Sequence, residues 1–133
     1  MAFLRTSRVA RLATVDERGR PHVVPVCYVF DGKDFYSPIG EKPKKMAPHR
    51  LKRIGNIGMN PYVSVDVDRY NDNWERLAYV IIAGKACLLT RGMQHRRAVM
   101  LLRNKYSRYR ATAIQDQPMI HIRAERFTSW GNF

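Results

Sequence analysis

Residues 8–37 read RVARLATVDERGRPHVVPVCYVFDGKDFYS, and this stretch decides the fold class. Its first part, residues 9–15, is apolar and partly alternating, and residues 16–19 (DERG) form a turn signal. The run that follows, residues 21–30, is rich in β-branched and aromatic side chains. Two such runs joined by a short polar turn predict a β-hairpin.

Two further features extend this hairpin. Residues 31–34 (DGKD) end its second strand, and residues 35–37 are expected to form a short third strand. Pro25 lies inside the second strand and has no N–H to donate to a ladder. We therefore expect that strand to lie at a sheet edge, to carry a bulge or to have an interrupted ladder.

The rest of the chain alternates between strands and two helices. The basic segment 41–53 (EKPKKMAPHRLKR) contains Pro48, which suits the first turn of a helix that runs to about residue 56. The spacing of Val99, Leu102 and Tyr106 predicts an amphipathic helix over residues 92–106, with Lys105 on its outer face. Further strands are expected at residues 62–67, at 77–89 with a bulge at Gly84, and at 119–127.

This order predicts a mainly β fold with appended helices. About six strands connected largely by hairpins, with few helices, indicate a six-stranded antiparallel barrel rather than a doubly wound sheet. A length of 133 residues fits a single domain, residues 1–133. A barrel of this size has little room for a deep private cavity, so we expect a homodimer in which a second subunit completes the site.

The charge balance restricts the partners without choosing one. The chain has 24 Lys and Arg against 11 Asp and Glu, a net charge of +13, which favours polyanions such as nucleic acid, acidic membranes or phosphorylated small molecules. The N-terminus carries no signal-peptide pattern, and the longest apolar run, residues 78–83, is too short to span a bilayer. These features predict a soluble, cytoplasmic protein that does not insert into a membrane.

No catalytic constellation is visible. The four histidines lie in four different elements without a metal-ligand pattern, which favours surface or structural roles: His22, His49, His95 and His121. Cys27 and Cys87 are far apart in apolar runs, so we interpret them as buried free thiols and expect no metal site. Phosphate-binding glycine loops are also absent, and an enzyme of this kind would depend on a cofactor for its chemistry.

The segment 37–45 (SPIGEKPKK), which leads into a basic helix, gives the best positive signal. Hydroxyl, ammonium and backbone groups at a strand end that faces a helix N-terminus suit a phosphate. Taken alone, a solvated basic helix face is the simpler interpretation. Nucleic-acid binding is a rival, but the aromatic side chains around Tyr28 and Phe35 lie in core-directed runs rather than on a stacking platform, which argues against it.

A family resemblance adds to these patterns. Residues 8–37, the stretch 42–74 (KPKKMAPHRLKRIGNIGMNPYVSVDVDRYNDNW) and the stretch 77–86 (LAYVIIAGKA) resemble, in order and spacing, the pyridoxamine 5′-phosphate oxidase-like split-barrel superfamily. Within it they look like the small F420-dependent oxidoreductase group. The resemblance implies an FMN-binding type of split β-barrel and a bound deazaflavin (coenzyme F420) or FMN.

The resemblance also implies site residues. The cofactor ring would lie along the second strand, and the phosphate arm would contact Ser37 and the basic segment, while Trp74 would reach the cofactor across a dimer. The residues implied are Val24, Pro25, Val26, Cys27, Tyr28, Ser37, Lys42, Lys44, Arg50, Arg53 and Trp74.

Two departures make vitamin B6 oxidation a poor fit. Val24 and Val29 stand where true pyridoxamine-phosphate oxidases carry Arg and Lys, and the C-terminal FTSWGNF lacks their substrate-binding motif. The expected function is hydride transfer to or from a small organic substrate. The alternatives are an FMN-dependent enzyme of the pyridoxamine-phosphate-oxidase type and a non-catalytic cofactor-binding protein. F420 stands first because six cations between Lys42 and Arg53 exceed what one FMN phosphate needs.

Overall fold

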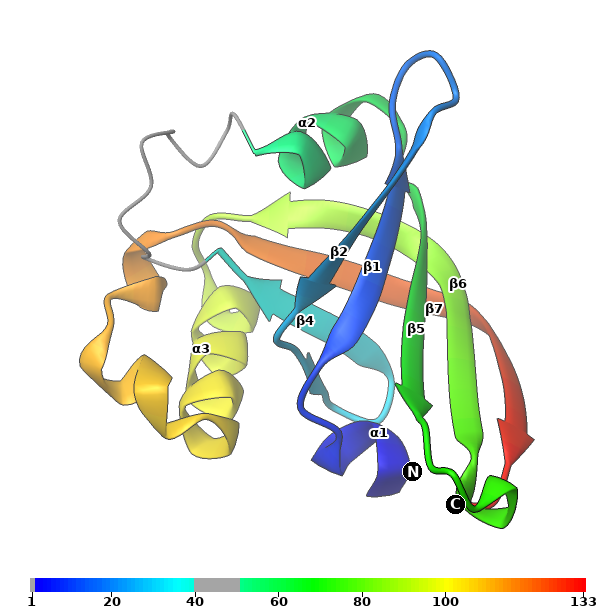
Figure 1. The fold of residues 1–133 in the computed structure, drawn as a ribbon. Coiled ribbons are helices and arrows are strands. Elements are labelled where there is room, and N and C mark those ends of the chain that lie inside the picture. The colour runs from blue at the N-terminus through cyan, green and yellow to red at the C-terminus, as the bar shows by residue number, and fades with distance from the viewer. Residues whose placement is uncertain (1, 40–50) are drawn as a thin grey trace.

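The computed structural model describes residues 2–39 and 51–133. Seven antiparallel strands form one curled half-barrel sheet in the order β2-β1-β5-β6-β7-β4-β3, with helices around it (Figure 1). The strands are β1 (Ala10–Val15), β2 (Pro21–Val26), β3 (Val29–Phe30), β4 (Asp34–Pro38), β5 (Tyr62–Arg69), β6 (Ala78–Leu89) and β7 (Met119–Gly131). The helices are α1 (Ala2–Thr6), α2 (Lys52–Met59) and α3 (Met93–Lys105), with 3-10 turns η2 (Trp74–Arg76), η3 (Ser107–Ala111) and η4 (Ile114–Asp116).

The mainly β split-barrel fold is confirmed, but the expected count of six strands is wrong. The run 21–30 does not form one strand, because its ladder stops at Val26 and resumes at Val29. The first piece pairs with β1, and the second pairs with β4. The chain therefore changes from one wall of the half-barrel to the other at Cys27 and Tyr28, and the structure has seven strands.

The first hairpin forms as expected, and its turn is held by one carboxylate. Asp16 Oδ1 accepts hydrogen bonds from the backbone N–H groups of Arg18 and Arg20, each at 2.9 Å. Gly19 provides the positive φ of 77° that the turn needs. Lys52 of α2 lies 3.6 Å from the same carboxylate, so the turn also fixes the start of that helix.

The expected bulge at Gly84 is confirmed. The register between β6 and β7 shifts between Ala83 and Gly84. A Cβ atom at Gly84 would collide with the backbone carbonyl of Arg123, so the close approach of the two strands requires glycine there.

Two apolar clusters hold the fold. The first fills the inside of the half-barrel and includes Leu12, Phe35 and Ile82. The second lies between α3 and the other wall, where Leu102 packs with Tyr36 of β4. Of the described helices, none is long and apolar enough to cross a membrane.

Helix positions agree with the sequence only in part. The second expected helix matches α3 closely, while α2 starts at Lys52 and runs to Met59, beyond the expected end near residue 56. Pro48, expected in its first turn, lies outside the described residues. The short helix α1 carries the buried Phe3 and Leu4 and was not expected, because five residues give too little periodicity to detect.

Candidate functional site

The strand β2 lies at one edge of the sheet, which is one of the three alternatives that Pro25 predicts. It pairs with β1 alone, and in the part of the chain that the structure describes no strand lies along its other edge. Val24 and Val26 turn half-buried toward the first apolar cluster, whereas Pro25 is exposed. Three of the expected ring-binding residues therefore lie on a strand with one open edge, where backbone groups are accessible to a ligand.

The chain leaves β2 at Cys27, where Ser37, another of the expected site residues, contacts it. Ser37 of β4 donates a hydrogen bond from its hydroxyl to the carbonyl of Cys27 at 2.8 Å. Ser37 is itself buried. The two walls of the half-barrel are thus linked directly at the end of the open edge.

Tyr28, the next expected residue, has internal partners for its polar groups. Its phenol donates to the carbonyl of Leu4 at 2.6 Å, and burial raises its pKa. Its backbone N–H donates to the Tyr106 hydroxyl at 3.2 Å, and its carbonyl accepts from Lys105 Nζ at 3.1 Å. Tyr28 therefore fixes the crossing between the two walls.

We expected Lys105 on the outer face of α3, but its side chain points inward, toward Tyr28. Its ammonium group sits 4.0 Å from the centre of the Tyr28 ring. Burial, and to a smaller extent the nearby charge of Arg8, lower the pKa of Lys105 to about 8. The helix ends against the crossing between the walls, and this contact turns its last lysine inward.

Arg53 lies in the first turn of α2. Its guanidinium is half-buried, and its Nε has no hydrogen-bond partner among the described residues. Burial lowers the pKa of Arg53, and the phenol of Tyr109, from η3, opposes that shift. Burial also raises the pKa of Tyr109, as does the adjacent thiol of Cys27. A desolvated cation with a free donor is a fitting partner for an anion.

A series of pairwise interactions links four elements in a region that we call the Arg53 corner. Ser37 of β4 bonds Cys27 after β2, the Cys27 thiol acts on Tyr109 of η3, and Tyr109 acts on Arg53 of α2. Lys42, Lys44 and Arg50 lie outside the described residues, in the connection between Ile39 and Leu51 that joins the strand of Ser37 to the helix of Arg53. The sequence offered no signal for Tyr109, since only the fold brings η3 to Cys27.

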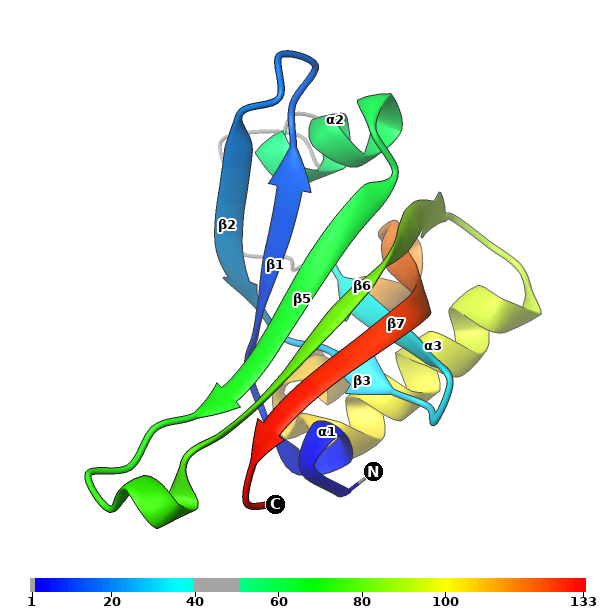
Figure 2. The ribbon, with the colours of Figure 1, turned by 90° about the vertical axis from the view of Figure 1, so that its right-hand side faces the viewer.

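Trp74 does not belong to this corner within one chain. It is 74% exposed, on the connection between β5 and β6. Figures 1 and 2 both place this connection at the end of the sheet opposite α2. Within one chain, Trp74 therefore lies at the other end of the sheet from the helix that carries Arg53.

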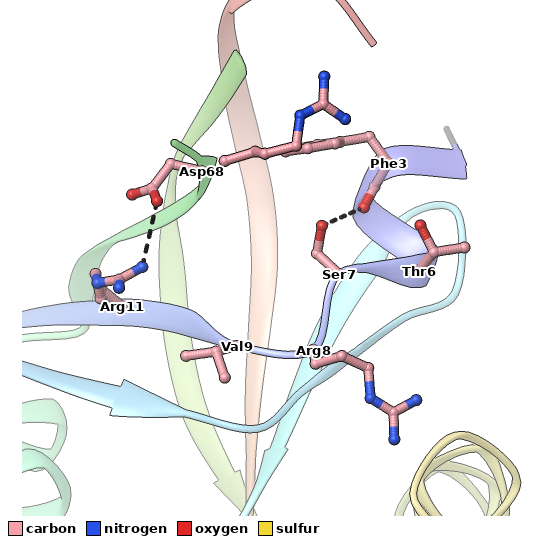
Figure 3. A pocket seen from close by; sticks show the side chains of 8 residues that line it. Phe3, Thr6, Ser7, Arg8, Val9, Arg11 and Asp68 are labelled. Carbon is pink, nitrogen blue, oxygen red and sulfur yellow. Dashed lines mark hydrogen bonds and ion pairs between the residues drawn. The ribbon is translucent and has the colours of Figure 1, made fainter. Parts of the chain in front are cut away.

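A pocket of about 460 Å³ lies between α1 and the adjoining ends of β1 and β5. Arg11 and Asp68 form an ion pair across it at 3.4 Å, and Ser7 bonds the carbonyl of Phe3 (Figure 3). Its other arginines are committed elsewhere, because Arg69 donates to the carbonyl of Arg76 and Arg8 to that of Lys105. The pocket offers less to an anion than the Arg53 corner does.

The two cysteines differ in exposure. Cys27 is half-buried, while Cys87 is exposed, so the expectation that both are buried is wrong for Cys87. The pairing of β6 with β5 ends at Lys85, and beyond it β6 pairs only with β7. Cys87 therefore lies where β6 has become an edge. Within the described residues no group of His, Cys, Asp and Glu side chains is arranged to hold a metal ion.

Comparison with known proteins gives the same fold. Residues 1–131 match the sequence model of a family described as pyridoxamine 5′-phosphate oxidase. No curated protein matches the sequence significantly. A conserved hypothetical protein of Mycobacterium tuberculosis has a TM-score of 0.79 at 21% identity, covering 98% of this chain and 81% of that one.

Two further solved structures carry names that mention a ligand. The haem storage protein HutZ of Vibrio cholerae has a TM-score of 0.73 at 17% identity, covering 98% of this chain and 89% of its own. An F420 reductase has a TM-score of 0.68 at 18% identity, covering 96% of this chain and 94% of its own. At these identities the likeness shows the fold.

Proposed function

The chain belongs to the pyridoxamine 5′-phosphate oxidase family, and from this premise we propose that it is a cytoplasmic oxidoreductase that holds coenzyme F420 or FMN at a homodimer interface. The family includes oxidoreductases, and an F420 reductase shares the fold. The bound ring would transfer hydride to or from a small organic substrate. The protein would supply orientation, charge neutralisation and a dry face for the ring.

The observation that carries this proposal is the buried Nε of Arg53, which has no hydrogen-bond partner among residues 2–39 and 51–133. A desolvated guanidinium is unfavourable without an anion, and a phosphate accepts two hydrogen bonds from it. Arg53 would hold the phosphate arm, together with Lys42, Lys44 and Arg50. Ser37, which is buried and donates its hydroxyl proton to the Cys27 carbonyl, would instead hold the end of the ring-binding strand in place. The ring would lie along the open edge of β2, from Val24 to the Cys27 carbonyl, with Tyr28 fixing the strand end.

The dimer would form on the outer face of the sheet, which Figure 2 shows with α3 behind it. A row of small or apolar side chains crosses β2, β1, β5 and β6, formed in that order by Val23, Ala13, Ser64 and Ala83. Val23 is 61% exposed and Ile81, in the next row, is 40% exposed. A second copy on this face would bury these side chains and bring its Trp74 toward the Arg53 corner.

Cofactor titration tests the proposal. Purified protein is titrated with FMN, with F420 and with haemin, at low and moderate salt, and the visible spectrum identifies any ligand that co-purifies. F420 extends its negative charge through a phosphodiester and glutamates, so we expect its affinity to exceed that of FMN and to fall more steeply with salt.

Each result decides between functions. Tighter binding of FMN than of F420 at moderate salt would reverse the order of the two cofactors. Binding of haemin alone would make this chain a haem-binding protein, as the name of HutZ suggests for that relative. Binding of none of the three would contradict the proposal.

A further inference from the structure

A row of polar side chains crosses three strands on the wall that α3 covers. Cys87 of β6 pairs with His121 of β7, and His121 pairs with Tyr36 of β4. In an antiparallel sheet, directly paired residues point to the same face. The sheet register thus places a thiol, an imidazole and a phenol side by side, and Asp34, two residues before Tyr36, lies on the same face.

The distances within this row show which nitrogen of His121 faces the carboxylate and which faces the thiol. His121 Nε2 lies 2.9 Å from Asp34 Oδ2, and His121 Nδ1 lies 3.7 Å from Cys87 Sγ. A carboxylate only accepts hydrogen bonds, so it fixes the tautomer in which Nε2 carries the proton. Nδ1 is then the free acceptor, and it faces the thiol.

The surroundings hold the imidazole in this position. His121 is 8% exposed and stacks on the Tyr36 ring, with the centres 4.9 Å apart and the planes at 11°. Gln94 Nε2 of α3 donates to the Tyr36 hydroxyl at 2.8 Å and also lies 3.4 Å from His121 Nε2, which is farther than the carboxylate of Asp34. The ring therefore cannot turn away from Cys87 without breaking these contacts.

The carboxylate of Asp34 is buried, and a positive charge beside it would stabilise it. Asp34 is 7% exposed, and its Oδ1 is buried without a hydrogen-bond partner among the described residues. An incompletely satisfied, desolvated carboxylate is stabilised when the imidazole beside it becomes a cation. Cys87, in contrast, is exposed, so the proton acceptor is enclosed while the sulfur is accessible.

We propose that Cys87 is a reactive thiol, activated by His121 and Asp34, that forms mixed disulfides with low-molecular-weight disulfides. The thiol proton passes to His121 Nδ1, and the thiolate attacks one sulfur of the incoming disulfide. The S–S bond of that molecule breaks as the bond to Cys87 Sγ forms. The leaving thiolate takes up a proton and departs as a thiol. Oxidation of Cys87 is thus balanced by reduction of the disulfide.

The test uses the full chain with Cys27→Ser, so that Cys87 is its one thiol. Its reaction with the neutral disulfide 4,4′-dithiodipyridine is followed at neutral pH by release of thiopyridone. A synthetic peptide of residues 84–90 reports the rate of the same cysteine without the fold. Exposure alone can bring Cys87 only up to the rate of the peptide, whereas a positioned general base should make it at least about tenfold faster.

Two variants identify the base. His121→Phe keeps a ring on Tyr36 but removes both nitrogens, and Asp34→Asn keeps the shape of the carboxylate without its charge. Both should bring the rate down to that of the peptide. His22→Gln, on β2, is the matched control and should keep the fast rate. Near-ultraviolet circular dichroism verifies the fold of each variant.

The proposal is overturned if Cys87 in the Cys27→Ser protein reacts no faster than the peptide, a comparison that needs no further variant. It is equally overturned if a folded His121→Phe protein stays fast. Mass spectrometry of the product must place the thiopyridyl group on Cys87.

Discussion

The hydroxyl of Tyr106 accepts a hydrogen bond from the backbone N–H of Tyr28, 78 residues earlier, at 3.2 Å, and lies 2.7 Å from the carbonyl of Arg8. One side chain at the end of α3 thus holds two backbone segments that enter and leave the first hairpin. This relationship fixes the place where the chain passes from one wall of the half-barrel to the other.

Tyr106→Phe should lower the free energy of unfolding by about 1–3 kcal/mol, since it leaves the buried N–H of Tyr28 without its acceptor. Urea denaturation measures the change. Tyr62→Phe alters a tyrosine that is 57% exposed and should stay within about 0.5 kcal/mol of the unmodified protein. Similar losses in both variants would show that the Tyr106 contact has no special weight.

Arg53→Ala should weaken cofactor binding by about 1–3 kcal/mol, the usual cost of one lost charge-assisted contact. Lys42→Ala should have an effect of the same size. Calorimetric titration measures both. Arg91→Ala removes the same charge from an exposed site after β6 and serves as the control. If all three variants lose affinity equally, the positive field of the whole protein, rather than the Arg53 corner, attracts the cofactor.

Asp66→Asn should stabilise the protein at pH 7 more than at pH 4. Burial and the neighbouring Asp68 raise the pKa of Asp66 to about 6, whereas Arg11 opposes that shift. The folded protein therefore holds a proton that the unfolded chain has lost, and stability falls as the pH rises from about 4 to about 6. Asp66 is only half-buried, so solvent screens its charge and we expect a gain of at most about 1 kcal/mol. Urea denaturation at both pH values measures it, and an equal effect at the two would contradict this assignment.

Val23→Arg should convert the proposed dimer to monomers, because it places a charge in the row of small or apolar side chains on the outer face of the sheet. Light scattering at micromolar concentration measures the mass. Met93→Arg adds the same charge at a side chain that is 80% exposed on α3 and should leave the dimer intact. A monomeric unmodified protein in the presence of cofactor would refute the dimer and the shared site together.

Local patterns were sufficient for much of the fold. Alternation defined the strands, Pro25 restricted its strand to an edge, a bulge or an interrupted ladder, of which the edge is found, and Gly84 predicted the bulge in β6. These features depend on the pleat and on backbone conformation, which a short stretch of sequence encodes. The break at Cys27 was missed, because the same apolar run serves two different walls.

The site depended more on distant contacts. Arg53 was expected from the sequence, whereas Tyr109 beside it was not, and the inward position of Lys105 was the reverse of what its helix face suggested. The pairing of His121 with Asp34 joins residues 87 positions apart. Sheet register decides such contacts, and no local periodicity reports the register between strands that are far apart in sequence.

The sheet order also has a consequence for biosynthesis. The hairpin of β3 and β4 joins the rest of the sheet only through β7, although β4 ends at residue 38 and β7 starts at residue 119. A growing chain on the ribosome can pair β1 with β2 early, but β4 has no strand beyond β3 to pair with until some eighty residues later. Such long-range closure slows folding. A nascent chain halted before Met119 should therefore keep Phe35 exposed and bind chaperones that recognise apolar segments.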